Sequence, residues 1–245
     1  SDDRAVPQRR HLPRSSGVFH PKVWVLRFVA PDHPVRYRVL CLSRNLTFDR
    51  SWDTVLSLDG TLLDREKGIT ASRGLGEFIA GLPRISRLPL PAPVKSKLGE
   101  LQDEVRRVRF EPPEGFEEVS FWPIGLTAKH DWPFKGRVER MLVVSPFIRA
   151  ATLAQLTADG EKHILVSRVE ELQALKPSAL KGFKEIYTLN ESADEVLEDP
   201  VSEVNGVPTS GLHAKLYVAD DGWAGRVWTG SANATNAAFG QNVEM

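Results

Sequence analysis

The most constraining feature of this sequence is a short polar pattern that occurs twice. Each copy places a histidine and a lysine two positions apart on an apolar run, and a later apolar run ends in a serine and an asparagine two positions apart. A single copy would carry little meaning because short motifs often match by chance. Two ordered copies with matching flanks indicate one active site built from two parts. The residues are His20, Lys22, Ser43 and Asn45 in the first copy and His213, Lys215, Ser231 and Asn233 in the second.

These residue types suit chemistry on a phosphodiester. Residues i and i+2 of an extended strand lie on one face, so each histidine is predicted to project beside its lysine. An imidazole can act as a nucleophile, an acid or a base. An ammonium is a three-donor cation that can hold a phosphate oxygen. We expect the asparagines to add neutral donors, and the serines either to donate hydroxyl hydrogen bonds or to cap their loops. One histidine could then attack phosphorus while the other protonates the leaving oxygen, without a metal or another cofactor.

The duplicated pattern resembles the signature of the phospholipase D superfamily, whose members carry two His-x-Lys…Asn motifs. The segments 230–233 and 242–244 are similar to the second signature of that family. Asp220 completes the longer His-x-Lys-x4-Asp form in the second copy, whereas Arg27 stands at the matching position of the first. The flanks of the two motifs are most similar to the nuclease and tyrosyl-DNA phosphodiesterase branches.

The resemblance implies an α/β fold with two pseudo-repeated phospholipase D-like halves. Each half would be a mixed, mostly parallel sheet flanked by helices, with the active site at the interface of the halves. From residue 138 onward, predicted strands and helices alternate, which favours a parallel sheet. The predicted organisation is a basic, irregular leader, a first half, a helical and proline-rich connection, and a second half, at 1–16, 17–72, 73–137 and 138–245.

Three local predictions bear on the motifs. The first His-x-Lys pair is predicted to lie within a strand over 17–29 that pairs with a strand over 35–42. A short helical turn is expected over 47–51. Apolar residues recur at helical spacing over 94–109, which predicts an amphipathic helix there.

The resemblance also implies roles for individual residues. By analogy with the superfamily, His20 would be the nucleophile that forms a covalent phosphohistidine, and His213 the general acid and later the base. The sequence is equally compatible with the reverse order. Asp53 and Glu244 are candidates to orient the two imidazoles and so to choose their tautomers, although Asp53 is equally typical of a surface residue at a strand start. The growing charge on the nonbridging oxygens would be bound by Lys22, Lys215, Asn45 and Asn233.

The predicted function is therefore metal-independent phosphodiester hydrolysis, with DNA as the favoured substrate. A lipid phosphodiesterase or phosphatidyl transferase is one alternative, and a non-catalytic DNA-docking module is another. A metal nuclease is disfavoured, because no acidic pair and histidine stand at convincing ligand spacing.

Composition narrows the class of protein. The chain has 32 basic and 32 acidic residues, so tight binding of nucleic acid by bulk charge is not expected. Cys41 is its one cysteine, which excludes an intrachain disulfide and favours a reducing, cytoplasmic location. No apolar run approaches the roughly 18 residues that predict a membrane helix.

The two motifs differ in what precedes them. Residues 138–212 precede His213 in its half, whereas only residues 1–19 precede His20. If both halves share one fold, the first lacks its opening elements. We therefore expect the sequence to be part of a longer chain, for example one with a helicase-type or other domain. Because both motifs stand in one chain, an oligomer is not required to complete the site.

Overall fold

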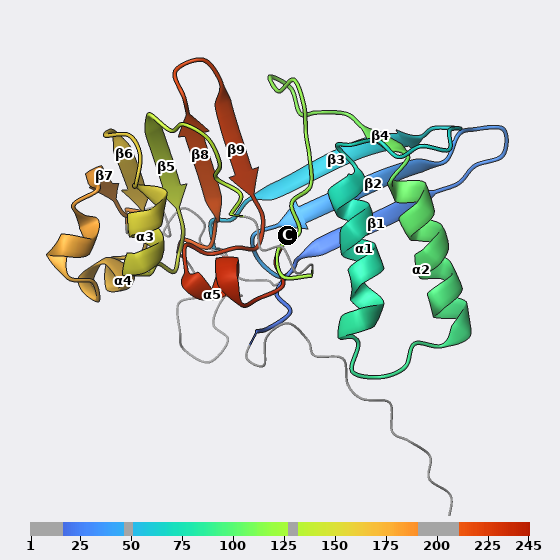
Figure 1. Cartoon of the computed structure of the whole chain (residues 1–245), viewed down its shortest axis with the longest axis horizontal. Coiled ribbons are helices and arrows are strands. Elements are labelled where there is room, and N and C mark those ends of the chain that lie inside the picture. The colour runs from blue at the N-terminus through green and yellow to red at the C-terminus, as the bar shows by residue number, and fades with distance from the viewer. Residues whose placement is uncertain (1–16, 47–50, 127–131, 191–210) are drawn as a thin grey trace, which may run out of the picture.

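Two β-sheets lie side by side in this chain (Figure 1). The computed structural model describes residues 17–46, 51–126, 132–190 and 211–245. Within these ranges the first sheet has four strands in the order β1-β2-β3-β4, and the second has five in the order β7-β6-β5-β8-β9. The last residues of the chain lie between the two sheets, where the letter C stands in Figure 1. None of the helices in the described ranges is long and apolar enough to cross a membrane.

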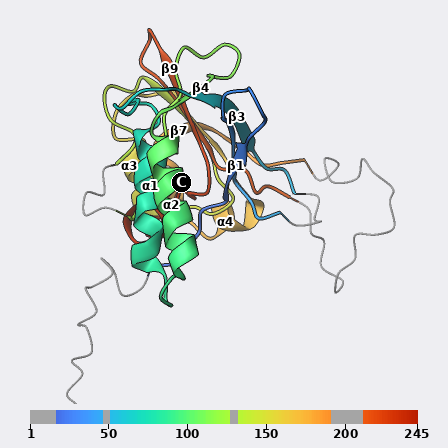
Figure 2. The same ribbon diagram turned by 90° about the vertical axis from the view of Figure 1, so that its right-hand side faces the viewer.

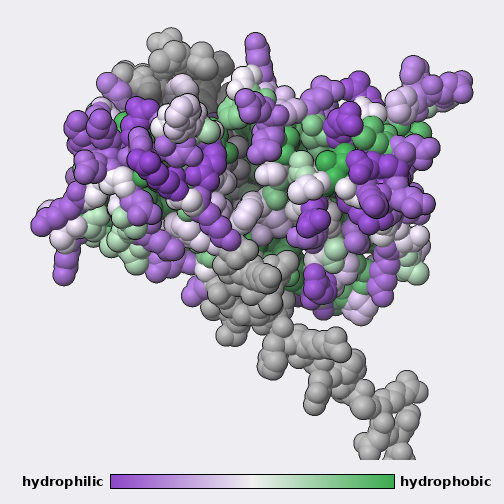
Figure 3. All heavy atoms as spheres, turned by 45° about the horizontal axis from the view of Figure 1, so that its top comes forward, coloured by the Kyte–Doolittle hydropathy of each residue, from purple (hydrophilic) through white to green (hydrophobic). Residues whose placement is uncertain are grey.

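The first sheet is antiparallel throughout, and two helices cover one of its faces (Figure 2). Alternate residues of each strand point toward these helices, so Tyr37, Val39 and Leu58 are at most 1% exposed. Hydrophobic residues also reach the surface over the half of the molecule that contains the first sheet (green, on the right of Figure 3). The elements are β1 (Val23–Phe28), β2 (Arg36–Leu42), β3 (Val55–Leu62), α1 (Arg73–Ile85), α2 (Ala92–Val105) and β4 (Val108–Phe110).

The second sheet is mixed. β5-β6 and β6-β7 pair in parallel through helical crossovers, whereas β5-β8 and β8-β9 pair antiparallel. Its core includes Val143, Leu153 and Leu165, all 0% exposed. The elements are β5 (Arg140–Val144), α3 (Ala150–Leu156), β6 (His163–Val166), α4 (Val169–Gln173), the 3₁₀ helix η1 (Pro177–Leu180), β7 (Phe183–Tyr187), β8 (Leu216–Asp220), β9 (Gly225–Thr229) and α5 (Asn236–Gly240).

The prediction of two repeated, mostly parallel halves is wrong. The strand–helix alternation expected after residue 138 is confirmed from β5 to β7, but the first sheet contains no parallel pair. The physical reason is the length of the connections. Short loops such as 29–35, between β1 and β2, can join only antiparallel neighbours, whereas a parallel pair needs a crossover of roughly a dozen residues or more. The segment 73–137 also supplies α1, α2 and β4 to the first sheet.

Element boundaries differ from prediction near the first motif. β1 begins at Val23, so His20 and Lys22 precede it, because the chain at Phe19 pairs with Val243 instead. The helix predicted over 94–109 ends at Val105, since the residues after it form β4 on the edge of the first sheet. The expected leader at 1–16 and most of the expected turn at 47–51 lie outside the described residues.

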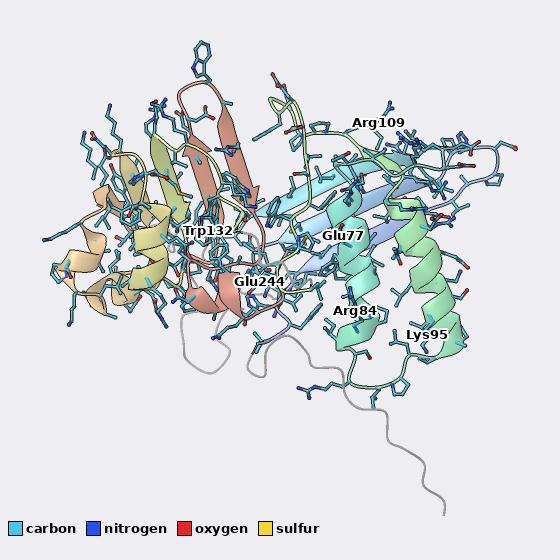
Figure 4. All side chains as sticks on the ribbon, viewed as in Figure 1. Glu77, Arg84, Lys95, Arg109, Trp132 and Glu244 are labelled. Atoms are coloured by element: carbon cyan, nitrogen blue, oxygen red, sulfur yellow. The ribbon has the colours of Figure 1, made fainter. Side chains whose placement is uncertain are left out.

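The C-terminal segment joins the two sheets through backbone hydrogen bonds. The amide of His20 donates to the carbonyl of Val243 at 3.0 Å, and the amides of Glu244 and Ile124 donate to each other's carbonyl at 3.1 and 3.0 Å. Gly125 allows this approach, because it adopts a φ of +83° and a Cβ there would lie 2.1 Å from a backbone oxygen. Glu244 is thereby carried into the space between the sheets (Figure 4).

Candidate active site

The two motifs meet where the N-terminal ends of β1 and β8 lie near each other. Trp52, which follows the first Ser-x-Asn, forms a parallel bridge with Leu212, and its carbonyl accepts hydrogen bonds from the amides of His213 and Ala214 at 2.7 and 2.8 Å. The hydroxyls of Thr54 and Thr229 lie 2.7 Å apart and join the start of β3 to the end of β9. The residues after the first motif thus hold the second His-x-Lys in place.

Glu244 is the buried carboxylate of this site. Its side chain is fully buried, and its Oε2 lies 3.0 Å from Nδ1 of His20. The hydroxyl of Ser231 donates to the same oxygen, and the side-chain NH₂ of Asn242 donates to Oε1 at 3.0 Å. A carboxylate accepts hydrogen bonds, so Nδ1 of His20 is the donor in this pair, and in the neutral form of the ring Nε2 has the lone pair.

Both motif lysines are buried, and each bonds back to its own histidine. Nζ of Lys22 donates to the carbonyl of His20 at 2.7 Å, and Nζ of Lys215 donates to the carbonyl of His213 at 2.8 Å. Burial lowers the pKa of both ammonium groups. For Lys215, burial first and the nearby charge of Lys22 second lower the pKa to about 7, while the charge of Glu244 opposes the shift. Two buried cations therefore share one buried carboxylate.

His213 is held in the neutral form at neutral pH. Its pKa is lowered to about 4 by burial, then by the charges of Lys215 and Arg168. Nζ of Lys215 lies 3.0 Å from its Nδ1. An ammonium only donates hydrogen bonds, so Nδ1 of His213 accepts from protonated Lys215 and Nε2 carries the hydrogen. The two imidazoles consequently have opposite partners and opposite tautomers.

Two arginines of the described residues add positive charge around the site. Arg168 follows β6, donates from Nε to the carbonyl of Leu212 at 2.8 Å, and stacks over the ring of Phe147 with 5.1 Å to its centroid. Arg44, inside the first Ser-x-Asn, also contributes to the lowered pKa of His213. Arg168 was not anticipated from the sequence. The available signal was its position directly after a predicted parallel strand, because ligands often bind at the carboxyl ends of such strands.

The two predicted aspartates have other partners. Asp53 accepts a hydrogen bond from Nε of Arg44 at 3.0 Å, and its charge raises the pKa of Lys215. It therefore lies near the site and is bonded to an arginine. Asp220 is at the far end of β8, where it pairs with Arg140 and accepts from the amide of Gly222. Its role there is in the hairpin turn, away from Lys215.

The remaining predicted residues lie in the loops that follow β2 and β9. The hydroxyl of buried Ser43 accepts a hydrogen bond from the amide of Thr54 at 2.8 Å, which holds the first loop in place. Asn45 is exposed in the same loop. Oδ1 of Asn233 is buried and has no hydrogen-bond partner among the described residues. Buried polar atoms are normally satisfied, so this atom indicates a position where a ligand or solvent completes the hydrogen bond.

Arg27 explains why the first copy departs from the longer motif. Its guanidinium donates two hydrogen bonds, at 2.7 and 2.9 Å, to Glu104 of α2, which also accepts from the hydroxyl of Tyr37. An aspartate at this position would face the same carboxylate. The first copy thus uses the position to fix α2 on the sheet.

No protein-family model, curated protein or solved structure matches this chain. In the described ranges, no group of three or more histidine, cysteine, aspartate or glutamate side chains is placed so that it could hold a metal ion. What the site can do is therefore inferred from its own side chains.

The lowered pKa of Lys215 predicts a pH-dependent stability. A lysine with a pKa of about 7 when folded and 10.5 when unfolded penalises the folded state below pH 7, and the penalty fades as the pH rises to 10.5. We expect Lys215→Met to be more stable than the wild type at pH 6, by on the order of 5 kcal/mol, and the difference to vanish near pH 10.5.

Urea unfolding of both proteins at several pH values measures this difference. Lys97→Met removes a lysine whose side chain is 83% exposed and serves as the control for the loss of a surface lysine. A wild-type-to-Lys215→Met difference that stays constant from pH 6 to 10.5 would contradict the prediction.

Proposed function

We propose that this protein is a metal-independent phosphodiesterase that cleaves DNA by the two-histidine chemistry of the phospholipase D superfamily. The observation that carries the proposal is the opposite pairing of the two imidazoles. Nδ1 of His20 lies 3.0 Å from the carboxylate of Glu244, and Nδ1 of His213 lies 3.0 Å from Nζ of Lys215. One ring then presents a lone pair at Nε2 and the other presents an N–H, which supply a nucleophile and an acid.

In the first step, Nε2 of His20 attacks phosphorus and forms a P–N bond. The P–O bond to the leaving group breaks, and Nε2–H of His213 protonates the leaving oxygen. His213 regains a proton at Nδ1 from the ammonium of Lys215, so no imidazolate forms. A pKa of about 7 suits Lys215 to this exchange, because proton transfer is most effective near the working pH. The phosphorylated ring of His20 is cationic, and buried Glu244 stabilises it.

In the second step, water attacks phosphorus and the P–N bond breaks. The water gives a proton to the free Nε2 of His213, and the proton at Nδ1 returns to Lys215. His20 is released with its lone pair restored, and the products are a phosphomonoester and a free hydroxyl. Lys22 binds a nonbridging oxygen as negative charge develops there.

A reducing, cytoplasmic location forms part of this proposal. Cys41 is buried, and burial raises the pKa of its thiol to about 12. A buried thiol of this kind acts as a small core residue rather than a nucleophile. The proposed reaction accordingly assigns it no role.

Cleavage of labelled single-stranded and duplex DNA in excess EDTA tests the proposal. We expect cleavage to survive chelation, because the proposed groups are side chains of the protein. Phosphatidylcholine vesicles form a third substrate arm. Activity that EDTA removes and Mg²⁺ restores would contradict the proposed chemistry. Turnover of the lipid alone would indicate a lipid phosphodiesterase, and DNA binding without any cleavage would indicate a docking module.

A further inference from the structure

The first sheet has a second face, which α1 and α2 do not cover (Figure 2). Residues of this face alternate along each strand with those that pack under the helices. On β1 they include two aromatic rings, Trp24 and Phe28, which are 49% and 50% exposed. A ring in contact with solvent on a sheet face is available to stack on another flat group.

Strand register places arginines in rows beside these rings. Phe28 pairs with Arg36 across β1 and β2, and Thr61 pairs with both Arg36 and Arg109. One row across the sheet therefore contains a ring and two guanidinium groups. Trp24 begins a second row, closer to the start of β1. Four residues of strand separate the two rings by about 13 Å.

The charge of this face is positive, although the chain as a whole is neutral. Its three strand arginines are Arg36, Arg38 and Arg109, and Asp59 is the one carboxylate among the strand residues of this face. Exposed Glu111, just after β4, lies next to Asp59, because its backbone amide donates to the Asp59 carbonyl at 2.8 Å. Asp59 is already paired with Arg38 by two hydrogen bonds of 2.8 Å. Within the described residues, the side chains of Arg36 and Arg109 form no hydrogen bond or salt bridge, although the charge of Arg36 helps to lower the pKa of Asp59, and both arginines are exposed.

This face is continuous with the candidate active site. Phe19 stacks on Phe78 of α1, with 6.4 Å between ring centroids, so its side of the chain faces the helix. His20, the next residue, projects to the opposite side of an extended chain. Along β1 the open face thus leads from Phe28 through Trp24 to the segment that carries Lys22 and His20.

We propose that the open face of the first sheet binds single-stranded DNA and leads it into the candidate active site. Bases stack on Trp24 and Phe28, and Arg36 and Arg109 contact phosphates. Single-stranded nucleic acid is favoured because its bases are free to stack on aromatic side chains, whereas a duplex hides their faces. The inference rests on the proposed function and narrows its substrate class.

Fluorescence anisotropy with a labelled single-stranded oligonucleotide tests binding separately from chemistry. The assay uses the His20→Ala background in EDTA, which prevents turnover. Trp24→Ala combined with Phe28→Ala is expected to weaken binding roughly 30-fold or more, since each lost base–aromatic stack has a large effect. Trp223→Ala, which removes a fully exposed tryptophan from the β8–β9 turn, is the matched control and should leave affinity unchanged.

The proposed phosphate contacts are tested by the salt dependence of the binding affinity. Arg36→Gln and Arg109→Gln should each reduce the slope of log affinity against log salt concentration by about 0.7, the value for one phosphate of a single strand. Unfolding curves establish that the variants fold. Unchanged affinity in the double aromatic variant would overturn the proposal, even if DNA is cleaved. Tighter binding of a matched RNA strand, or of duplex DNA, would also overturn it by assigning a different occupant.

A loss of binding in these variants would support the proposal even if no substrate is cleaved in EDTA. The binding test of the open face can therefore succeed or fail independently of the cleavage test of the proposed function. In a cleaving protein, the double aromatic variant should raise KM for single-stranded DNA and leave kcat nearly unchanged, because Trp24 and Phe28 lie outside the reacting groups.

Discussion

His20→Ala and His213→Ala are each expected to lower DNA cleavage in EDTA by roughly three orders of magnitude or more. His20→Ala removes the nitrogen that would form the bond to phosphorus. His213→Ala removes the proton donor for the leaving oxygen and the base for the second step. Because the two groups act as a unit, the double variant should be little slower than either single variant.

The two histidines can be distinguished by the leaving group. With a nitrophenyl phosphodiester as substrate, the nitrophenolate leaving group departs without protonation. His213→Ala should therefore release a first burst of nitrophenol and then stop at the phosphohistidine. His20→Ala should show no burst. His33→Ala changes an exposed loop histidine and is the control, with wild-type activity expected. Near wild-type DNA cleavage by His213→Ala would contradict the two-part site, and a burst from His20→Ala alone would reverse the assignment of the nucleophile.

Glu244→Gln is expected to lower turnover by on the order of 10²–10⁴-fold while preserving the size of the side chain. If the new amide NH₂ faces His20, it donates to Nδ1 and moves the ring hydrogen to Nε2, which removes the nucleophilic lone pair. If its oxygen faces His20 instead, its NH₂ faces the side-chain NH₂ of Asn242. Two donors then oppose each other, and the hydrogen bond from Asn242 is lost. Either orientation also loses the negative charge that stabilises the cationic phosphohistidine.

The tautomer of His20 is the readout that separates positioning from general stability. Nitrogen chemical shifts should report a hydrogen on Nδ1 in the wild type and a changed tautomer or ring orientation in Glu244→Gln. Glu104→Gln is the matched control, because Glu104 is also a hydrogen-bonded carboxylate, 20% exposed, but pairs with Arg27 and Tyr37. It should lose stability and keep its turnover. Equal activity of Glu244→Gln and wild type would exclude a positioning role for Glu244.

The spacing of each histidine and lysine in the sequence predicted that the two side chains would project side by side. In both copies the structure shows that the lysine Nζ bonds to the carbonyl of the histidine two positions earlier, at 2.7 and 2.8 Å. This contact is local, but it was not predicted from the sequence. The strands and helices after residue 138 were predictable because their apolar periodicity is local.

Partners across long separations were not predictable in the same way. Asp53 and Glu244 were both candidates to orient an imidazole, yet only the packing of the sheets places Glu244 against His20 and Asp53 against Arg44. The residues of the first pair are separated by 224 positions. The composition of the chain allows either carboxylate to make either contact. The path of the C-terminal segment between the sheets decides which contact forms.

By itself, the sequence determined which side chains are present in each motif and how each histidine and lysine are spaced. The tertiary structure alone decided that β4 joins the first sheet, that Arg168 lies beside His213, and that the two imidazoles have opposite partners. Strand pairing and long-range contacts depend on loop lengths and on the burial of whole faces, which involve many residues at once. A motif specifies its own residues, but the packing of the two sheets and the C-terminal segment determines which side chains contact them.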